Sequence, residues 1–254
     1  MNDASVTIVQ NTEHSPTFRE LSFTWDASLG RPRAGQFLEL RLPGTTAPLL
    51  RRPFAFSAYD EENQTASFVY EVRGTTTQLL STMEPGMPLQ ILGPLGNMFH
   101  AKTKGVIAVG GGIGLGPILY AAHQLSPHHD LTLVTGYRSQ ESIPYSLYTP
   151  SCPPSICTDD GSAGVKGNVV EYLESLPQER FRDTTILACG PHPMLAALAS
   201  FSNAVGCTCL VSMEEMMACG IGACMGCVID RTDGTKARVC KEGPIFNSGE
   251  VVWT

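Results

Sequence analysis

The sequence predicts a multidomain protein of mixed β and α/β class, with three parts in a row. Up to about residue 100, short alternating runs are broken by glycine and proline, which is typical of a small antiparallel β-barrel. Beyond it, apolar strands alternate with helices, and this order predicts a parallel α/β domain. From residue 212 onward glycine and cysteine dominate and little periodicity remains. We therefore expect domains at residues 1–100, 101–211 and 212–254.

The elements follow from the spacing of apolar residues. In the first part, alternation predicts strands at residues 7–9, 18–23, 36–42, 67–72 and 89–92, and a short helix over residues 77–83. In the second part, it predicts strands at residues 106–109, 131–134, 185–188 and 207–211, and helices that end near residue 125 and cover residues 169–176 and 193–205. The third part is expected to hold its shape around something other than a hydrophobic core, because roughly 40 residues rarely bury enough apolar surface.

The charge balance argues against nucleic acid and anionic membranes as partners. The chain has 17 Lys and Arg against 24 Asp and Glu, a net charge of −7, and no run of basic residues. Residues 1–10 contain no basic residue and no apolar segment as long as that of a signal peptide, which disfavours secretion. The uncharged stretch at residues 105–122 is too rich in glycine for a membrane span. We therefore expect a soluble, cytoplasmic protein.

Four of the nine cysteines lie close together near the C-terminus, with the spacing Cys219-x4-Cys224-x2-Cys227-x12-Cys240. The first three follow the plant-type pattern for a [2Fe–2S] cluster, which four thiolates hold. The residues between them are small, so the loop can curl around a cluster and direct backbone N–H groups at its sulfurs. A structural zinc site and unligated thiols are the alternatives. Zinc sites usually pair two short cysteine motifs, and this segment contains one.

A glycine-rich turn in the second part predicts a nucleotide site. Gly110, Gly111, Gly112 and Gly114 follow an apolar strand and open a helix, a context in which a pyrophosphate rests on backbone amides. A tight turn made for packing alone is the alternative. The next strand is not followed by the usual acidic residue, so the choice between NAD and NADP stays open.

Two further stretches are candidates for cofactor contacts. Cys189-Gly190-Pro191 ends a later strand, where ligands of open α/β sheets bind, although proline also simply begins helices. In the first part, Arg52 can fork onto a pyrophosphate and Phe54 can pack against a flat ring. Taken alone this motif is a weak signal, because an arginine at a strand edge is more often a solvated surface residue.

The order of these motifs resembles that of the ferredoxin–NAD(P) reductase superfamily. More closely, the chain is similar to the family of electron-transfer subunits of NAD-linked, type B dihydroorotate dehydrogenases. The resemblance covers essentially the whole chain. It rests on GPLGN at 93–97, the glycine turn at 110–117, TDDGS at 158–162, MACGIGAC at 217–224 and VCKEGPIF at 239–246.

The resemblance implies FAD in the barrel, NAD(H) in the α/β domain and a [2Fe–2S] cluster held by the four C-terminal cysteines. It implies that the flavin and its phosphates contact Arg52, Pro53, Phe54 and Ala55. It further implies that Tyr70, Glu71 and Val72 flank the flavin, and that Thr76 and Thr77 hold the pyrophosphate. Three residues depart from the family pattern. Serine is usual at Ala55, so Ser57 or a backbone amide would replace its hydrogen bond. Glycine is usual at Thr76, and arginine at Met216.

The resemblance also implies the function. Electrons from dihydroorotate would reach FMN in a separate catalytic subunit, cross the cluster one at a time to FAD, and leave as a hydride to NAD⁺, a step of pyrimidine biosynthesis. The partner would be that FMN-containing subunit, in a heterotetramer. No catalytic acid, base or nucleophile is expected of this chain. The rivals are another NAD(P)H-dependent flavin/iron–sulfur oxidoreductase subunit and a zinc-stabilised nucleotide-binding regulatory module.

Overall fold

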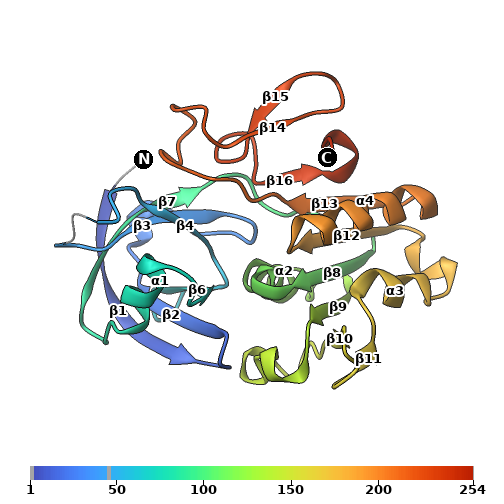
Figure 1. The fold of residues 1–254 in the computed structure, drawn as a ribbon, viewed down its shortest axis with the longest axis horizontal. Helices are drawn as coiled ribbons and strands as arrows, with labels where there is room; N and C mark the ends of the chain where they lie inside the picture. Colours follow the sequence, from blue (N-terminus) through green and yellow to red (C-terminus); the bar gives the residue numbers. More distant parts are fainter. Residues whose placement is uncertain (1–2, 45–46, 254) are drawn as a thin grey trace.

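The computed structural model describes residues 3–44 and 47–253. Its first half is a seven-stranded antiparallel sheet in the order β4-β3-β7-β1-β2-β6-β5 (Figure 1). The strands are β1 (Asp3–Glu13), β2 (Phe18–Thr24), β3 (Phe37–Arg41), β4 (Arg52–Ala55), β5 (Ala58–Asp60), β6 (Thr65–Glu71) and β7 (Pro88–Leu95). The five strands predicted in this part are confirmed, and the structure adds β4, which carries Arg52, and the short β5.

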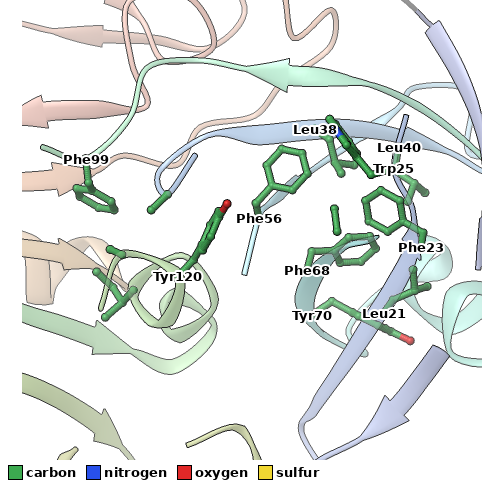
Figure 2. Packing of buried hydrophobic residues seen from close by; sticks show 14 of the residues in the cluster. Leu21, Phe23, Trp25, Leu38, Leu40, Phe56, Phe68, Tyr70, Phe99 and Tyr120 are labelled. Carbon is green, nitrogen blue, oxygen red and sulfur yellow. The ribbon is translucent and has the colours of Figure 1, made fainter. Parts of the chain in front are cut away.

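Alternation along these strands sends one set of side chains into a shared core. Figure 2 shows Phe23, Phe56 and Phe68 packed together with Leu38 and Leu40 of β3. Because successive residues of a strand point to opposite faces, Phe37 and Glu39 lie on the outer face of β3. Both are nevertheless buried, so another part of the chain covers that face.

The helix α1 (Thr75–Ser81) lies two residues earlier than the predicted 77–83. Its first turn is closed by Thr77, whose hydroxyl oxygen accepts hydrogen bonds from the backbone N–H of Arg73 at 3.0 Å and of Gly74 at 3.1 Å. These contacts satisfy amide groups that a helix start leaves free, which is why the helix begins before the threonine rather than at it.

The second half is a seven-stranded sheet in the order β11-β10-β9-β8-β12-β13-β16, parallel apart from β16. Its elements are β8 (Gly105–Gly111), α2 (Leu115–Leu125), β9 (Asp130–Tyr137), β10 (Ser155–Thr158), β11 (Val165–Lys166), α3 (Val169–Glu174), β12 (Thr184–Cys189), α4 (His192–Val205), β13 (Thr208–Ser212) and β16 (Ile245–Asn247). The predicted strands and helices of the α/β part are confirmed to within three residues at each end, with β10 and β11 as additions. Among the described residues, no helix is long and apolar enough to cross a membrane.

The C-terminal segment departs from expectation. It contains the hairpin of β14 (Val228–Asp230) and β15 (Lys236–Arg238), and β16, which pairs Phe246 with Val211 of β13. Its buried side chains join the hydrophobic core of the α/β sheet: Cys227, Ile229, Ala237, Val239, Cys240, Phe246 and Val251. The expectation of a segment without a hydrophobic core is therefore wrong. The C-terminal segment shares the hydrophobic core of the α/β sheet, and this shared core compensates for the small size of the segment.

The C-terminal segment lies across the barrel and the α/β half (Figure 1). The residues that follow β7 hold it there. The side chain of Asn97 donates to the carbonyls of Glu242 at 3.1 Å and Ile245 at 2.8 Å, and accepts from the N–H of Ile245 at 2.8 Å. A Cβ on Gly96 would lie 2.5 Å from Cδ of Pro244, so glycine is required there for the close approach.

Candidate functional site

The four cysteines predicted as ligands meet in two pairs. The N–H of Cys224 donates to Sγ of Cys219 at 3.4 Å, and the N–H of Cys240 donates to Sγ of Cys227 at 3.4 Å. Cys224 is exposed, whereas Cys227 and Cys240 are buried. The loop therefore holds one pair at the surface and one pair against the core.

The cysteine loop bends where its glycines allow it. Gly220 and Gly222 have φ of +67° and +83°, a conformation that residues with a side chain rarely adopt. This bend directs the N–H of Gly222 at Sγ of Cys240, 3.1 Å away. Arg238 fixes the bend from outside, since it donates to the carbonyl of Gly222 at 2.6 Å and is ion-paired with Glu242.

The electrostatics of the two pairs differ. Burial raises the pKa of the Cys219 thiol, but hydrogen bonds from the backbone N–H of Ile221, Cys224 and Ala223 outweigh it and lower the pKa to about 6. Burial, followed by the neighbouring Cys227, raises the pKa of Cys240 to about 12. Thiolate is the form that ligates metal, so Cys219 is prepared for ligation by its amides.

These donors fit an iron–sulfur cluster. In the described part of the chain, no three His, Cys, Asp or Glu side chains gather around a point that one metal ion would occupy. The cysteines stand as two pairs, and four thiolates shared between two irons give two to each. The amides directed at sulfur are the contacts that stabilise such clusters.

A buried carboxylate beside the cysteine loop was not anticipated from the sequence. Glu39 is fully buried on the outer face of β3, and neither of its carboxyl oxygens has a hydrogen-bond partner among the described residues. A Cβ on Gly220 would lie 2.5 Å from Cγ of Glu39. Burial raises the pKa of Glu39 to about 7; Arg51 and Arg52 oppose the rise, and Cys219 adds to it. An alternating strand predicts a solvated glutamate at this position, and only the packing of the distant tail buries it.

The two glycine stretches predicted in the α/β part lie against each other. A Cβ on Gly114 would lie 2.2 Å from the carbonyl oxygen of Cys189, and one on Gly190 would lie 3.0 Å from the carbonyl oxygen of Gly111. Both stretches stand at the carboxyl ends of the paired strands β8 and β12. The absence of side chains lets the two stretches pack backbone against backbone. A Cβ on Gly112 would meet no atom within 4 Å, so at this residue the turn leaves its backbone open to a dinucleotide phosphate.

The barrel residues divide into two groups. The ring of Phe54 stacks on Phe68 at a centroid distance of 4.4 Å, and the hydroxyl of Tyr70 donates to Asn11 at 2.8 Å. Both rings therefore belong to the barrel core. The guanidinium of Arg52 donates to the carbonyls of Leu50 and Arg51, and in the described part of the chain it has no carboxylate partner. A cation that is not ion-paired with a carboxylate fits a phosphate.

Around β6 and α1 the predicted residues are placed as follows. Glu71 is buried and ion-paired with Arg73, and burial raises its pKa, while Val72 is exposed. Thr76 is buried, and the hydroxyl of Thr77 is engaged in closing α1. The hydroxyl of Thr77 would therefore have to leave these contacts before it could meet a phosphate, whereas the backbone groups of the turn would not.

Ser57 joins the barrel to the α/β half. Its hydroxyl donates to Oε1 of Glu20 at 3.4 Å, and a Cβ on Gly116 of α2 would lie 3.6 Å from its Cβ. The candidate flavin strand β4 therefore ends close to the helix that the glycine turn opens. Ala55, two residues before Ser57, carries no hydroxyl to donate.

Comparisons with known proteins agree with this arrangement. Residues 214–252 match the family model of the iron–sulfur cluster binding domain of dihydroorotate dehydrogenase B. The chain is 36% identical over 250 residues to the electron transfer subunit of dihydroorotate dehydrogenase B (NAD(+)) of Caldanaerobacter subterraneus subsp. tengcongensis, and 37% identical over 258 residues to that of Enterococcus faecalis. Each alignment covers 97% of this chain and 97% of the relative.

Solved structures share the fold. An NADH-dependent reduced ferredoxin–NADP oxidoreductase superposes with a TM-score of 0.85 at 26% identity, covering 98% of this chain and 90% of that one. A ferredoxin NADP⁺ reductase from Neisseria gonorrhoeae superposes with a TM-score of 0.65 at 17% identity, covering 81% and 92%. Together with the close sequence relatives, these matches show that the chain belongs to the family of electron transfer subunits of NAD(+)-linked dihydroorotate dehydrogenase B.

Proposed function

We propose that this chain carries electrons between an FMN-containing, dihydroorotate-oxidising catalytic subunit and NAD⁺ in the cytoplasm, within a heterotetramer. The observation that carries the proposal is the pairing of Cys219 with Cys224 and of Cys227 with Cys240, with backbone N–H groups directed at sulfur. When bound, a [2Fe–2S] cluster supplies one-electron transfer and FAD supplies the exchange of a hydride with NAD. The protein supplies position and electrostatics.

The cluster would be ligated by Cys219, Cys224, Cys227 and Cys240. The amides that lower the pKa of Cys219 would keep its sulfur in the thiolate form. Arg238 would keep the loop in shape through the carbonyl of Gly222, while its charge is balanced by Glu242. We take residues 212–254 as the cluster-binding part, residues 1–100 as the FAD part and residues 101–211 as the NAD part.

FAD would lie along β4 and the start of α1. Arg52 would exchange its carbonyl partners for a phosphate, since an ionic hydrogen bond is stronger than a neutral one. The backbones of Pro53, Phe54 and Ala55, and of Tyr70, Glu71 and Val72, would flank the flavin ring. Ser57 would supply the hydroxyl that Ala55 lacks, and Thr76 and Thr77 would offer backbone amides to the pyrophosphate.

NAD would bind where the two glycine stretches meet. Backbone amides of Gly110, Gly111, Gly112 and Gly114 would face its phosphates, and Cys189, Gly190 and Pro191 would border the nicotinamide side. The cramped contact of Gly114 with the carbonyl of Cys189 supports one joint site rather than two. Ser57 lies near the start of α2, which favours an approach of NAD to a flavin held on β4.

The catalytic subunit would dock at the surface pair of cysteines. Met216 is 88% exposed and Met225 56% exposed, and Ile221 and Cys224 are exposed beside them. Methionine adapts its shape to a partner and is enriched in the buried centre of interfaces. Electrons would then cross at the cysteines nearest the partner.

The visible spectrum of anaerobically purified protein, before and after NADH, tests the proposal. We expect flavin bands with a broad iron–sulfur absorption, bleached by NADH. Cys224→Ser should abolish turnover with the catalytic subunit while NADH still reduces the flavin. Cys152→Ser, outside the cluster loop, is the matched control and should behave as wild type. A colourless protein that retains zinc would overturn the proposal.

A further inference from the structure

A line of polar side chains crosses the contact between the barrel and the α/β half. At the surface end, Nδ1 of His14 lies 2.7 Å from Oγ of Ser146. Nε2 of His14 lies 3.6 Å from Oε2 of Glu20, and Oγ of Ser57 lies 3.4 Å from Oε1 of Glu20. The order Ser146–His14–Glu20–Ser57 therefore leads from an exposed loop to the strand proposed to hold the flavin.

These side chains are enclosed by apolar neighbours. The side chains of His14 and Glu20 are 10% and 25% exposed, and Ser57 is 7% exposed. Phe18, Val69 and Leu115 pack beside them in the same contact. Nε2 of His14 is covered yet has no hydrogen-bond partner among the described residues. Burying such groups costs free energy, so packing alone does not account for them.

The pKa values of Glu20 and His14 are shifted toward each other. Burial raises the pKa of Glu20, and a hydrogen bond from Ser57 partly opposes the rise. Burial, together with the charge of Arg19, lowers the pKa of His14. Arg19 is itself paired with Glu13, and Tyr137 faces Phe18 from the α/β side. Groups with closer pKa values exchange a proton with a smaller free-energy difference.

The proposed reaction requires a path for one proton. The hydride of NADH would bring one proton and two electrons together to a bound flavin, and NAD⁺ would be left. The electrons then leave one at a time through the cluster, which carries electrons only. One proton per NADH must therefore pass from the flavin to water, and in the direction of NAD⁺ reduction one proton must enter.

We propose that Ser57, Glu20 and His14 position and carry this proton between the flavin and the solvent beside Ser146. The inference rests on the proposed function, since it needs a flavin beside Ser57. The 3.6 Å gap between His14 and Glu20 is longer than a hydrogen bond and would close by a small side-chain rotation. Ser57 is the contact with the flavin, and Glu20 and His14 act through it.

The test separates hydride transfer from electron exit in the cofactor-loaded chain. NADH reduction of the flavin needs no solvent proton, so its stopped-flow rate should stay within about twofold of wild type in Glu20→Gln and His14→Ala. Exit of the electrons to ferricyanide should slow by about tenfold or more in both variants. Glu62→Gln, the same carboxylate-to-amide change on the exposed turn between β5 and β6, is the control and should leave both rates unchanged.

Two further readouts distinguish a proton path from a structural effect. Imidazole added to His14→Ala should restore electron exit in proportion to its concentration. In NMR titrations of the oxidised protein, the imidazole of His14 should titrate at lower pH in Glu20→Gln, because the adjacent carboxylate that favours the imidazolium is gone.

The outcomes are separable. Wild-type electron exit in Glu20→Gln and His14→Ala, or slowing that imidazole does not relieve, would overturn the proton path. If Glu20→Gln fails to bind FAD, the electron-exit rate of His14→Ala tests the proton path, because His14 lies at the solvent end of that path. A wild-type protein that NADH does not bleach would instead refute the proposed function.

Discussion

Glu39 shows how a single residue is changed by its distant neighbours. It stands on β3 between Leu38 and Leu40, which fill the barrel core. Its own side chain leaves the barrel and meets the cysteine loop at Gly220, where no described group forms a hydrogen bond with it. A buried acid without a partner favours the neutral form, and its pKa rises to about 7 for this reason first.

This shift predicts a stability that depends on pH. The pKa of Glu39 is higher in the folded protein, about 7, than the ordinary value of 4.5. The folded state therefore holds its proton more firmly, and stability falls as pH rises from about 4.5 to about 7 and then levels off. Glu39→Gln should leave the free energy of unfolding nearly unchanged at pH 4.5 and raise it at pH 8, by on the order of 2–3 kcal/mol.

Urea unfolding of wild type and Glu39→Gln at both pH values measures this difference. Glu62→Gln, on the exposed turn between β5 and β6, is the control and should change stability little at either pH. An equal effect of Glu39→Gln at pH 4.5 and pH 8 would show that Glu39 does not bury its charge.

Sequence patterns predicted the residues that act through local spacing and missed those that act across the fold. The four cysteines lie close together in the chain, and so do the glycines of the turn, so both groups could be found from the sequence alone. Glu39 meets Gly220, and His14 meets Ser146, and in both cases the neighbour is more than 100 residues away in the chain. No local pattern records such a contact.

At the scale of elements, length decided what could be predicted. Strands with several alternating positions, such as β2 and β6, stand out from the sequence. β14, β15 and β16 have three residues each, too few for a period of two to be recognised. They are held by pairing with other elements: β16 with β13, and the hairpin strands with each other. Because such short strands show no periodic pattern, no hydrophobic core was expected for the C-terminal segment.

Asn97 makes a prediction at this scale, because it ties the end of β7 to the turn before β16. Its side chain makes three hydrogen bonds, to the carbonyls of Glu242 and Ile245 and from the N–H of Ile245. Asn97→Ala should lower the free energy of unfolding by about 2–3 kcal/mol, roughly 1 kcal/mol for each bond. It should also speed loss of the cluster, since the same turn follows Cys240.

Urea unfolding and the decay of iron–sulfur absorbance under air test this prediction. Asn63→Ala, in the exposed turn between β5 and β6, removes an asparagine with a local partner only and serves as the control. Unchanged stability and unchanged cluster lifetime in Asn97→Ala would mean that β16 and the core hold the segment without this tie.

At the scale of the whole molecule, the barrel borders both of the other sites. The outer face of β3 is covered by the cysteine loop at Glu39, and the end of β4 approaches α2 at Ser57. A flavin on β4 would thus have the cluster on one side and NAD on the other, as a relay requires. The exposed end of this relay is the surface around Met216 and Met225.

That surface carries the last prediction. Introducing a charge into the centre of a buried interface leaves it without water or a partner, so Met216→Glu and Met225→Glu should each weaken binding of the catalytic subunit by about tenfold or more. Val165→Glu places the same charge on an exposed apolar residue of β11 and should not change the affinity.

Calorimetric titration with the catalytic subunit measures the dissociation constants. The visible spectrum of each variant, with intact flavin and cluster bands, shows that only docking is affected. Full-strength binding by both methionine variants would place the partner on another face, and electrons would then have to leave the cluster by a longer route than the exposed Cys224 offers.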